Sequence, residues 1–103
     1  ITNVRFHKAN LDFFFKKESK RKKVPNPDII IVDPPRAGMH KDMVNSLPKF
    51  GAQRLVYVSC NPTTQARDVA LLMENGYTLK KLSMIDMFPH TPHIETVGVL
   101  EKR

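Results

Sequence analysis

The sequence predicts an α/β fold whose sheet is mostly parallel and ends in an antiparallel hairpin. Residues 28–32 and 55–59 are apolar runs rich in β-branched side chains, which is typical of buried strands. A helix-length segment separates these runs, and a connection of that length returns the chain in the same direction by a right-handed crossover. Residues 77–87 and 96–100 are two further strands. The segment between them is too short for a crossover helix, so they are expected to pair antiparallel.

The N-terminal quarter predicts one short strand and a loop. Residues 4–7 alternate between apolar and polar side chains, which indicates a strand ending near Asn10. Residues 11–15 predict a helical turn. The basic run 16–23 and the two prolines after it predict a loop, because proline lacks a backbone donor and disfavours helix. Residues 28–32 show no alternation, so this strand is expected to be buried on both faces.

Two helices are expected. The first covers residues 41–47 and is followed by a proline and a glycine that end it. The second begins after Asn61, a good N-cap, has a proline in its first turn and ends before Gly76. Apolar side chains of this second helix recur at i, i+3, i+4 and i+7 and are predicted to face the core: Ala66, Val69, Ala70 and Met73.

The composition limits the partners and the compartment. The 103 residues carry 17 Lys and Arg against 10 Asp and Glu, a net charge of +7, with much of the excess in residues 16–23. Such a run permits a phosphate-bearing partner and is equally compatible with a solvated loop. A single cysteine excludes an internal disulfide and suits a reducing, cytoplasmic compartment. The aliphatic run 29–32 is far too short to span a membrane. The chain starts at Ile1 rather than Met, as a fragment or a processed piece would.

Two candidate side chains lie where the predicted parallel strands end, and ligands of open α/β sheets bind beyond that edge. Asp33 follows one strand and Cys60 the next. Neighbouring strands lie about 5 Å apart, so one substrate could touch both side chains. At a strand-to-helix junction, exposed backbone N–H groups favour a thiolate, which makes Cys60 a candidate nucleophile. The alternative is that Cys60 is a small buried hydrophobic residue.

Two neighbouring segments offer further polar groups. The two prolines after Asp33 make a rigid extended turn, which can present the carboxylate to a ligand or simply end the strand. Glu95 ends a loop stiffened by two prolines. In apolar surroundings it could take a proton near neutral pH, and the alternative is an exposed Glu. A metal triad of His90, His93 and Glu95 is disfavoured because neither histidine lies on regular structure, so no metal is expected.

Three segments carry specific motifs: residues 33–38 (DPPRAG), 56–68 (VYVSCNPTTQARD) and 86–95 (DMFPHTPHIE). Together they resemble the S-adenosylmethionine-dependent RNA uracil-5-methyltransferases, which make 5-methyluridine in ribosomal or transfer RNA. The resemblance covers essentially the whole chain. It implies that residues 1–103 are the C-terminal part of a Rossmann-like class I methyltransferase domain, lacking the glycine-rich cofactor-binding strand. It also implies S-adenosylmethionine as cofactor and RNA as partner.

The same resemblance assigns roles to residues. The cysteine of the Ser-Cys-Asn-Pro motif is the family's nucleophile and maps to Cys60; the glutamate of the His-x-Glu motif is its general base and maps to Glu95. Cofactor contacts map to Asp33 and Asn10. A thiolate added to carbon 6 of uracil makes carbon 5 able to attack the methyl group, and a base then removes the carbon 5 proton. The uridine is expected to be extruded from its stack.

Two other interpretations stay open on the sequence. An amine-directed nucleic-acid methyltransferase would grip an amino group with Asp33 and its prolines, but Arg36 stands where such motifs carry a stacking aromatic residue. A basic RNA-binding module would use residues 16–23 and have no active site. We expect the isolated chain to be inactive without the cofactor strand. We also expect the exposed edge of the 29–32 strand to pair with the first strand or with another chain.

Overall fold

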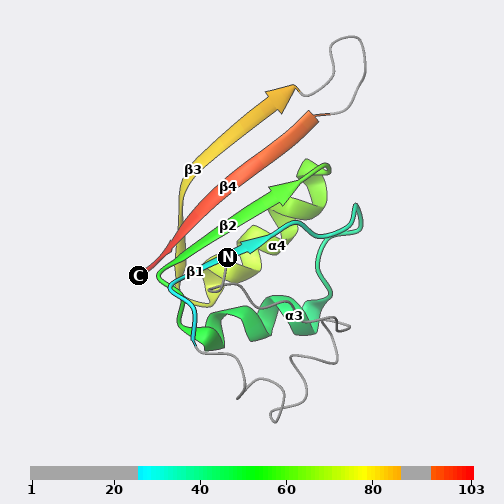
Figure 1. The fold of residues 1–103 in the computed structure, drawn as a ribbon. Helices are drawn as coiled ribbons and strands as arrows, with labels where there is room; N and C mark the ends of the chain where they lie inside the picture. The colour runs from blue at the N-terminus through cyan, green and yellow to red at the C-terminus, as the bar shows by residue number, and fades with distance from the viewer. Residues whose placement is uncertain (1–25, 87–93) are drawn as a thin grey trace, which may run out of the picture.

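The computed structural model describes residues 26–86 and 94–103. The predicted strand at 4–7, the helical turn at 11–15, the basic run 16–23 and Asn10 lie outside the described residues. The described elements follow one another along the chain as shown in Figure 1: β1 (Ile29–Val32), α3 (Lys41–Ser46), the 3₁₀-helix η1 (Leu47–Phe50), β2 (Arg54–Ser59), α4 (Pro62–Glu74), β3 (Tyr77–Asp86) and β4 (Ile94–Lys102).

The strands form one four-stranded sheet in the order β1-β2-β4-β3. β1 and β2 are parallel, while β4 is antiparallel to both of its neighbours, β2 and β3. Three strands therefore run in one direction and β4 runs against them. This arrangement confirms the predicted α/β fold, its parallel crossover and its terminal antiparallel hairpin.

The crossover between β1 and β2 ends as the sequence predicts. His40 is the N-cap of α3, and its Nδ1 accepts a hydrogen bond from the Asp42 N–H at 3.2 Å. Pro48 lies within η1, where the chain tightens after α3. Gly51 then adopts a left-handed conformation with φ of 71°, which favours glycine because that region lacks room for a Cβ. The helix is therefore stopped by the two residues expected to stop it.

Helices α3 and α4 pack on one side of the sheet, and only there does β1 reach the core. Ile30 and Val32 pack against the core, whereas Ile29 is 52% and Ile31 is 70% exposed. The prediction that this strand is buried on both faces was wrong. An unbroken β-branched run is suited to a strand that is covered on both faces, but the described helices cover only one face of this sheet. The fully or nearly buried core residues are Met39, Val44, Leu47, Ala52, Leu55, Tyr57, Val69, Leu72, Tyr77 and Leu100.

Helix α4 buries a different face from the predicted one. The side chains of Ala66 and Ala70 are exposed and Met73 is 41% exposed, so of the expected stripe only Val69 is buried. The residues that face the core keep the i, i+3, i+4, i+7 spacing but start one residue earlier: Gln65, Asp68, Val69 and Leu72. The prediction failed because two of these four residues are polar, and their burial depends on hydrogen-bond partners that periodicity does not reveal.

Candidate functional site

Cys60 lies at the junction of β2 and α4 and is exposed. The chain turns there on the preceding serine, since the Asn61 N–H donates to Ser59 Oγ and that hydroxyl lies 2.9 Å from the Asn61 carbonyl. Asn61 then caps α4, its Oδ1 accepting a hydrogen bond from the Thr63 N–H at 3.1 Å. The predicted strand-to-helix junction is thus present, and the structure shows Cys60 at the surface rather than in the core.

Glu95 reaches the same end of the sheet from β4. It is half-buried near the start of that strand. In the antiparallel register of β2 and β4, Ser59 pairs with Thr96. Cys60 directly follows β2, and Glu95 directly precedes Thr96 on β4. The candidate nucleophile and the candidate base therefore each adjoin the last pair of one ladder. His90 and His93 lie outside the described residues.

Asp33 lies at the same end of the sheet. It is exposed and follows β1, whose last residue, Val32, pairs with Tyr57 in the parallel register with β2. The carboxyl ends of β1 and β2 thus lie beside each other, with the amino end of β4 next in the sheet. Three of the four predicted site residues, Asp33, Cys60 and Glu95, therefore lie at the carboxyl end of the parallel strands, where α/β folds bind ligands.

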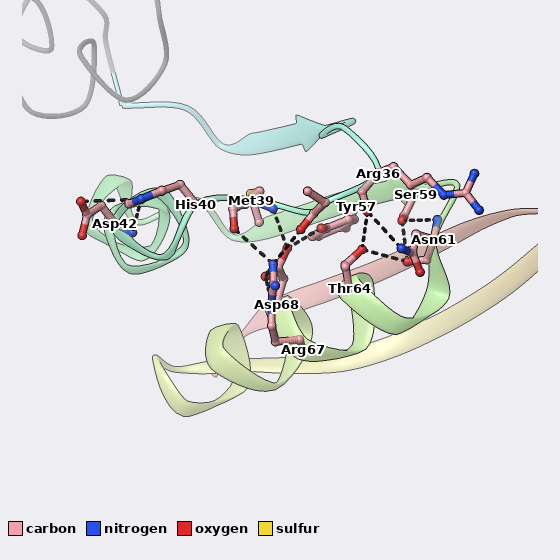
Figure 2. Close-up of polar contacts among 11 residues, drawn as sticks. Arg36, Met39, His40, Asp42, Tyr57, Ser59, Asn61, Thr64, Arg67 and Asp68 are labelled. Atoms are coloured by element: carbon pink, nitrogen blue, oxygen red, sulfur yellow. Dashed lines mark hydrogen bonds and ion pairs between the residues drawn. The ribbon is translucent and has the colours of Figure 1, made fainter.

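The loop after Asp33 is tied to the first turns of α4 (Figure 2). The Arg36 carbonyl accepts hydrogen bonds from Asn61 Nδ2 at 3.1 Å and from Thr64 Oγ1 at 3.0 Å. Within the loop, the Gly38 N–H donates to the Pro35 carbonyl at 2.8 Å, which closes a tight turn. The segment that follows β1 and the one that follows β2 are therefore held together by side chains of a single helix.

A buried carboxylate fixes the far end of this loop. Asp68 is fully buried, and its Oδ2 accepts hydrogen bonds from the Met39 N–H at 2.8 Å and from the Tyr57 hydroxyl at 2.6 Å. Its Oδ1 accepts two more from the Arg67 guanidinium, each at 3.1 Å. Burial, together with the bond to Asp68, raises the pKa of Tyr57, so the hydroxyl stays protonated and donates. Gly38 has φ of 84°, and a Cβ there would lie 2.8 Å from Asp68 Oδ2, so the loop can approach this close only as glycine.

The residues of α4 that hold this loop follow a polar pattern in the sequence, which the prediction from apolar residues overlooked. Asn61, Thr64, Gln65 and Asp68 are spaced at i, i+3, i+4 and i+7 and form a polar stripe on one face of α4. All four make hydrogen bonds to the ends of strands or to the loop after β1. A polar stripe directly after a capped helix start, beside an apolar one, indicates a helix that organises loops as well as a core.

The described part of the chain shows neither a metal-binding cluster nor a membrane-spanning helix. Residues 26–86 and 94–103 contain no group of three His, Cys, Asp or Glu residues arranged to hold a metal ion. Among the helices of the same ranges, none is long and apolar enough to cross a membrane.

The chain matches known methyltransferases in sequence. A family model described as tRNA (uracil-5-)-methyltransferase matches residues 9–103. An uncharacterized RNA methyltransferase of Nitratidesulfovibrio vulgaris is 46% identical over 103 residues, 99% of this chain and 22% of that protein. The 23S rRNA (uracil(1939)-C(5))-methyltransferase RlmD of Hahella chejuensis is 44% identical over 104 residues, 99% of this chain and 23% of that protein. The chain thus spans about a fifth of the length of these relatives.

Solved structures give the same result. The Pyrococcus abyssi tRNA (uracil-54, C5)-methyltransferase, solved with S-adenosyl-L-homocysteine, is 51% identical, has a TM-score of 0.64, and aligns over 71% of this chain and 18% of its own. The complex of M1.HpyAVI with SAM has a TM-score of 0.71 over 94% of this chain and 52% of its own. At 17% identity, this second likeness shows the fold alone.

Proposed function

The chain belongs to the tRNA (uracil-5-)-methyltransferase family, and on that premise we propose that the protein containing it methylates carbon 5 of a uridine in ribosomal or transfer RNA, with S-adenosylmethionine as the methyl donor. The observation that carries the proposal is the last pair of the β2–β4 ladder, Ser59 and Thr96, which Cys60 and Glu95 adjoin in sequence. Asp33 at the same edge supports it. A nucleophile and a base within reach of one ring are what the reaction requires.

The proposed reaction assigns one role to each residue. The Cys60 thiolate adds to carbon 6 of the uracil, and the electron pair of the 5,6 double bond moves into an enolate. Bound S-adenosylmethionine would supply an electrophilic methyl group: as carbon 5 forms its bond to this methyl, the methyl–sulfur bond breaks and S-adenosylhomocysteine leaves. Glu95 then takes the carbon 5 proton, the double bond re-forms, and the bond between Cys60 Sγ and carbon 6 breaks. The nucleophile has to stay reduced, which suits the cytoplasm.

The cofactor is proposed to lie against the segment after β1. Asp33 is exposed at the carboxyl end of that strand, and the loop behind it is fixed by the buried Asp68. A carboxylate held at this edge suits the hydroxyl and amino groups of a nucleoside. Asn10, the other residue implied as a cofactor contact, lies outside the described residues.

The amine-directed alternative explains less of the site. It would use Asp33 and the two prolines after it, but it gives no role to Cys60 or Glu95. The RNA-binding alternative depends on residues 16–23, which lie outside the described residues. It likewise leaves Cys60 and Glu95 without a function.

The proposal is tested in the full-length parent protein carrying Glu95→Gln, mixed with cellular RNA and S-adenosylmethionine. The amide cannot take the carbon 5 proton, so methylation proceeds but release stalls. We expect a covalent protein–RNA band on a denaturing gel, and sequencing of the trapped RNA identifies the uridine. The matched control is Glu101→Gln on the same strand, whose carboxylate faces Arg54 at the strand's other end; it should give no band. Normal turnover by Glu95→Gln without a band would refute the role of Glu95.

We further propose that the isolated 103 residues are inactive, and that the edge of β1 pairs with another chain or with residues 4–7, which lie outside the described residues. Within the described residues β1 is the end strand of the sheet, and Ile29 and Ile31 are exposed on its uncovered face. Methyl transfer by the isolated chain would contradict the first statement. Sedimentation of the isolated chain as a strict monomer, with the β1 amides unprotected from hydrogen exchange, would contradict the second.

A further inference from the structure

We propose that Gln65 and Thr96 are positioning residues that fix the backbone next to Cys60 and Glu95. This inference rests on the proposed function. Each of the two residues is adjacent to the machinery without being part of it. Thr96 follows Glu95 on β4, and Gln65 lies on α4 beneath the last pair of the β2–β4 ladder.

The contacts join three elements at one point. Gln65 Nε2 donates to the Tyr57 carbonyl on β2 at 3.0 Å and to the Thr96 carbonyl on β4 at 3.3 Å. Its Oε1 accepts from the Thr96 hydroxyl at 2.6 Å. That hydroxyl also lies 3.3 Å from the Ser59 carbonyl, and its single proton belongs to the shorter contact. A side chain from α4 thus clamps the two strands where the ladder ends.

The amide can lie in one orientation only. Both groups facing Nε2 are backbone carbonyls, which accept and cannot donate, so the NH₂ group must point toward them. Gln65 is 3% and Thr96 is 2% exposed, so water does not compete for these bonds. Among the described residues, no buried side-chain nitrogen or oxygen lacks a partner. The clamp is therefore rigid, and its geometry passes directly to the neighbouring residues, Glu95 and Cys60.

A buried polar network is not needed to fill this space. Leucine has nearly the volume of glutamine, and the adjacent Gly98 leaves room, since a Cβ there would lie 3.7 Å from Gln65 Nε2. An apolar residue would pack α4 onto the sheet without fixing the strands in register. Hydrogen bonds fix the direction as well as the distance between two groups. A reaction that uses two catalytic residues needs both, because about 1 Å of misplacement can cost a hundredfold in rate.

The test compares Gln65→Leu, Thr96→Val and their double variant in the full-length parent protein, measuring kcat, KM and the fraction of protein covalently bound to RNA. We expect kcat to fall about ten- to a hundredfold, with KM for both substrates nearly unchanged. The covalent fraction should rise, because a misplaced Glu95 delays proton removal after the adduct has formed. The double variant should be no worse than Gln65→Leu, since both changes remove the same contact.

Two controls separate positioning from folding. Thr96→Ser keeps the hydroxyl and should retain nearly full activity. Leu72→Ala, also on α4 and 1% exposed, should lower the melting temperature without raising the covalent fraction. An equal loss of all steps with no rise in adduct, or additive effects in the double variant, would overturn the positioning role. If Glu95→Gln itself forms no adduct, the proposed function fails instead, so the two failures are distinguishable.

Discussion

Replacing Cys60 by alanine in the parent protein should abolish methyl transfer, lowering the rate by at least about 10⁴-fold. Without the thiolate, carbon 5 of uracil is too weak a nucleophile to attack the methyl group. Cys60→Ser should be equally inactive, because a serine hydroxyl is hardly ionised near neutral pH. The measurement is incorporation of labelled methyl groups into RNA.

The Cys60→Ala variant should lose its chemistry without losing its fold. Cys60 is exposed and outside the core, so the variant should fold and bind both substrates normally. It should also erase the covalent band formed by Glu95→Gln. Activity above about one per cent of the unmodified protein would exclude covalent catalysis by this residue.

Replacing Asp68 by alanine should cause the largest loss of stability, about 3 kcal/mol in local opening free energy. The change leaves the buried Tyr57 hydroxyl and the Met39 N–H without this acceptor and removes the carboxylate that pairs with Arg67. Amide hydrogen exchange in the parent protein should show protection of α4 and β2 reduced about a hundredfold. KM for S-adenosylmethionine should rise, because the loop that follows Asp33 loses its anchor.

The matched control for Asp68→Ala is Glu101→Gln. Glu101 also pairs with an arginine, at 3.2 Å from Arg54, but both side chains are substantially exposed. Exposed pairs contribute about 0–1 kcal/mol, so exchange should change by less than about fivefold. Equal effects of the two substitutions would mean that the buried carboxylate does not anchor the loop.

The sequence predicted most of the described architecture because the residues that begin and end its helices and strands act locally. Asn61 caps α4, Gly51 closes the preceding helical segment, and the short connection before β4 forces a hairpin. These signals act within a few residues and need no tertiary partner. The edge position of Cys60 and Asp33 followed from the same strand boundaries.

Three features could not be predicted because they depend on partners distant in sequence. The buried face of α4 is decided by Gln65 and Asp68, whose acceptors and donors lie on other elements. The exposure of Ile31 depends on which face of β1 the helices cover. The pairing of Ser59 with Thr96, which Cys60 and Glu95 adjoin, likewise depends on the β2–β4 register, which no single segment encodes.

The polar stripe of α4 limits how the sequence can change in length. Asn61, Thr64, Gln65 and Asp68 reach three separate targets from fixed angular positions on one helix. One inserted residue would rotate every later position by about 100° and carry Asp68 away from Met39 and Tyr57. A substitution in this segment removes the contacts of one side chain, whereas a change in its residue count displaces every contact that follows. Insertions and deletions must therefore be accommodated outside these two turns.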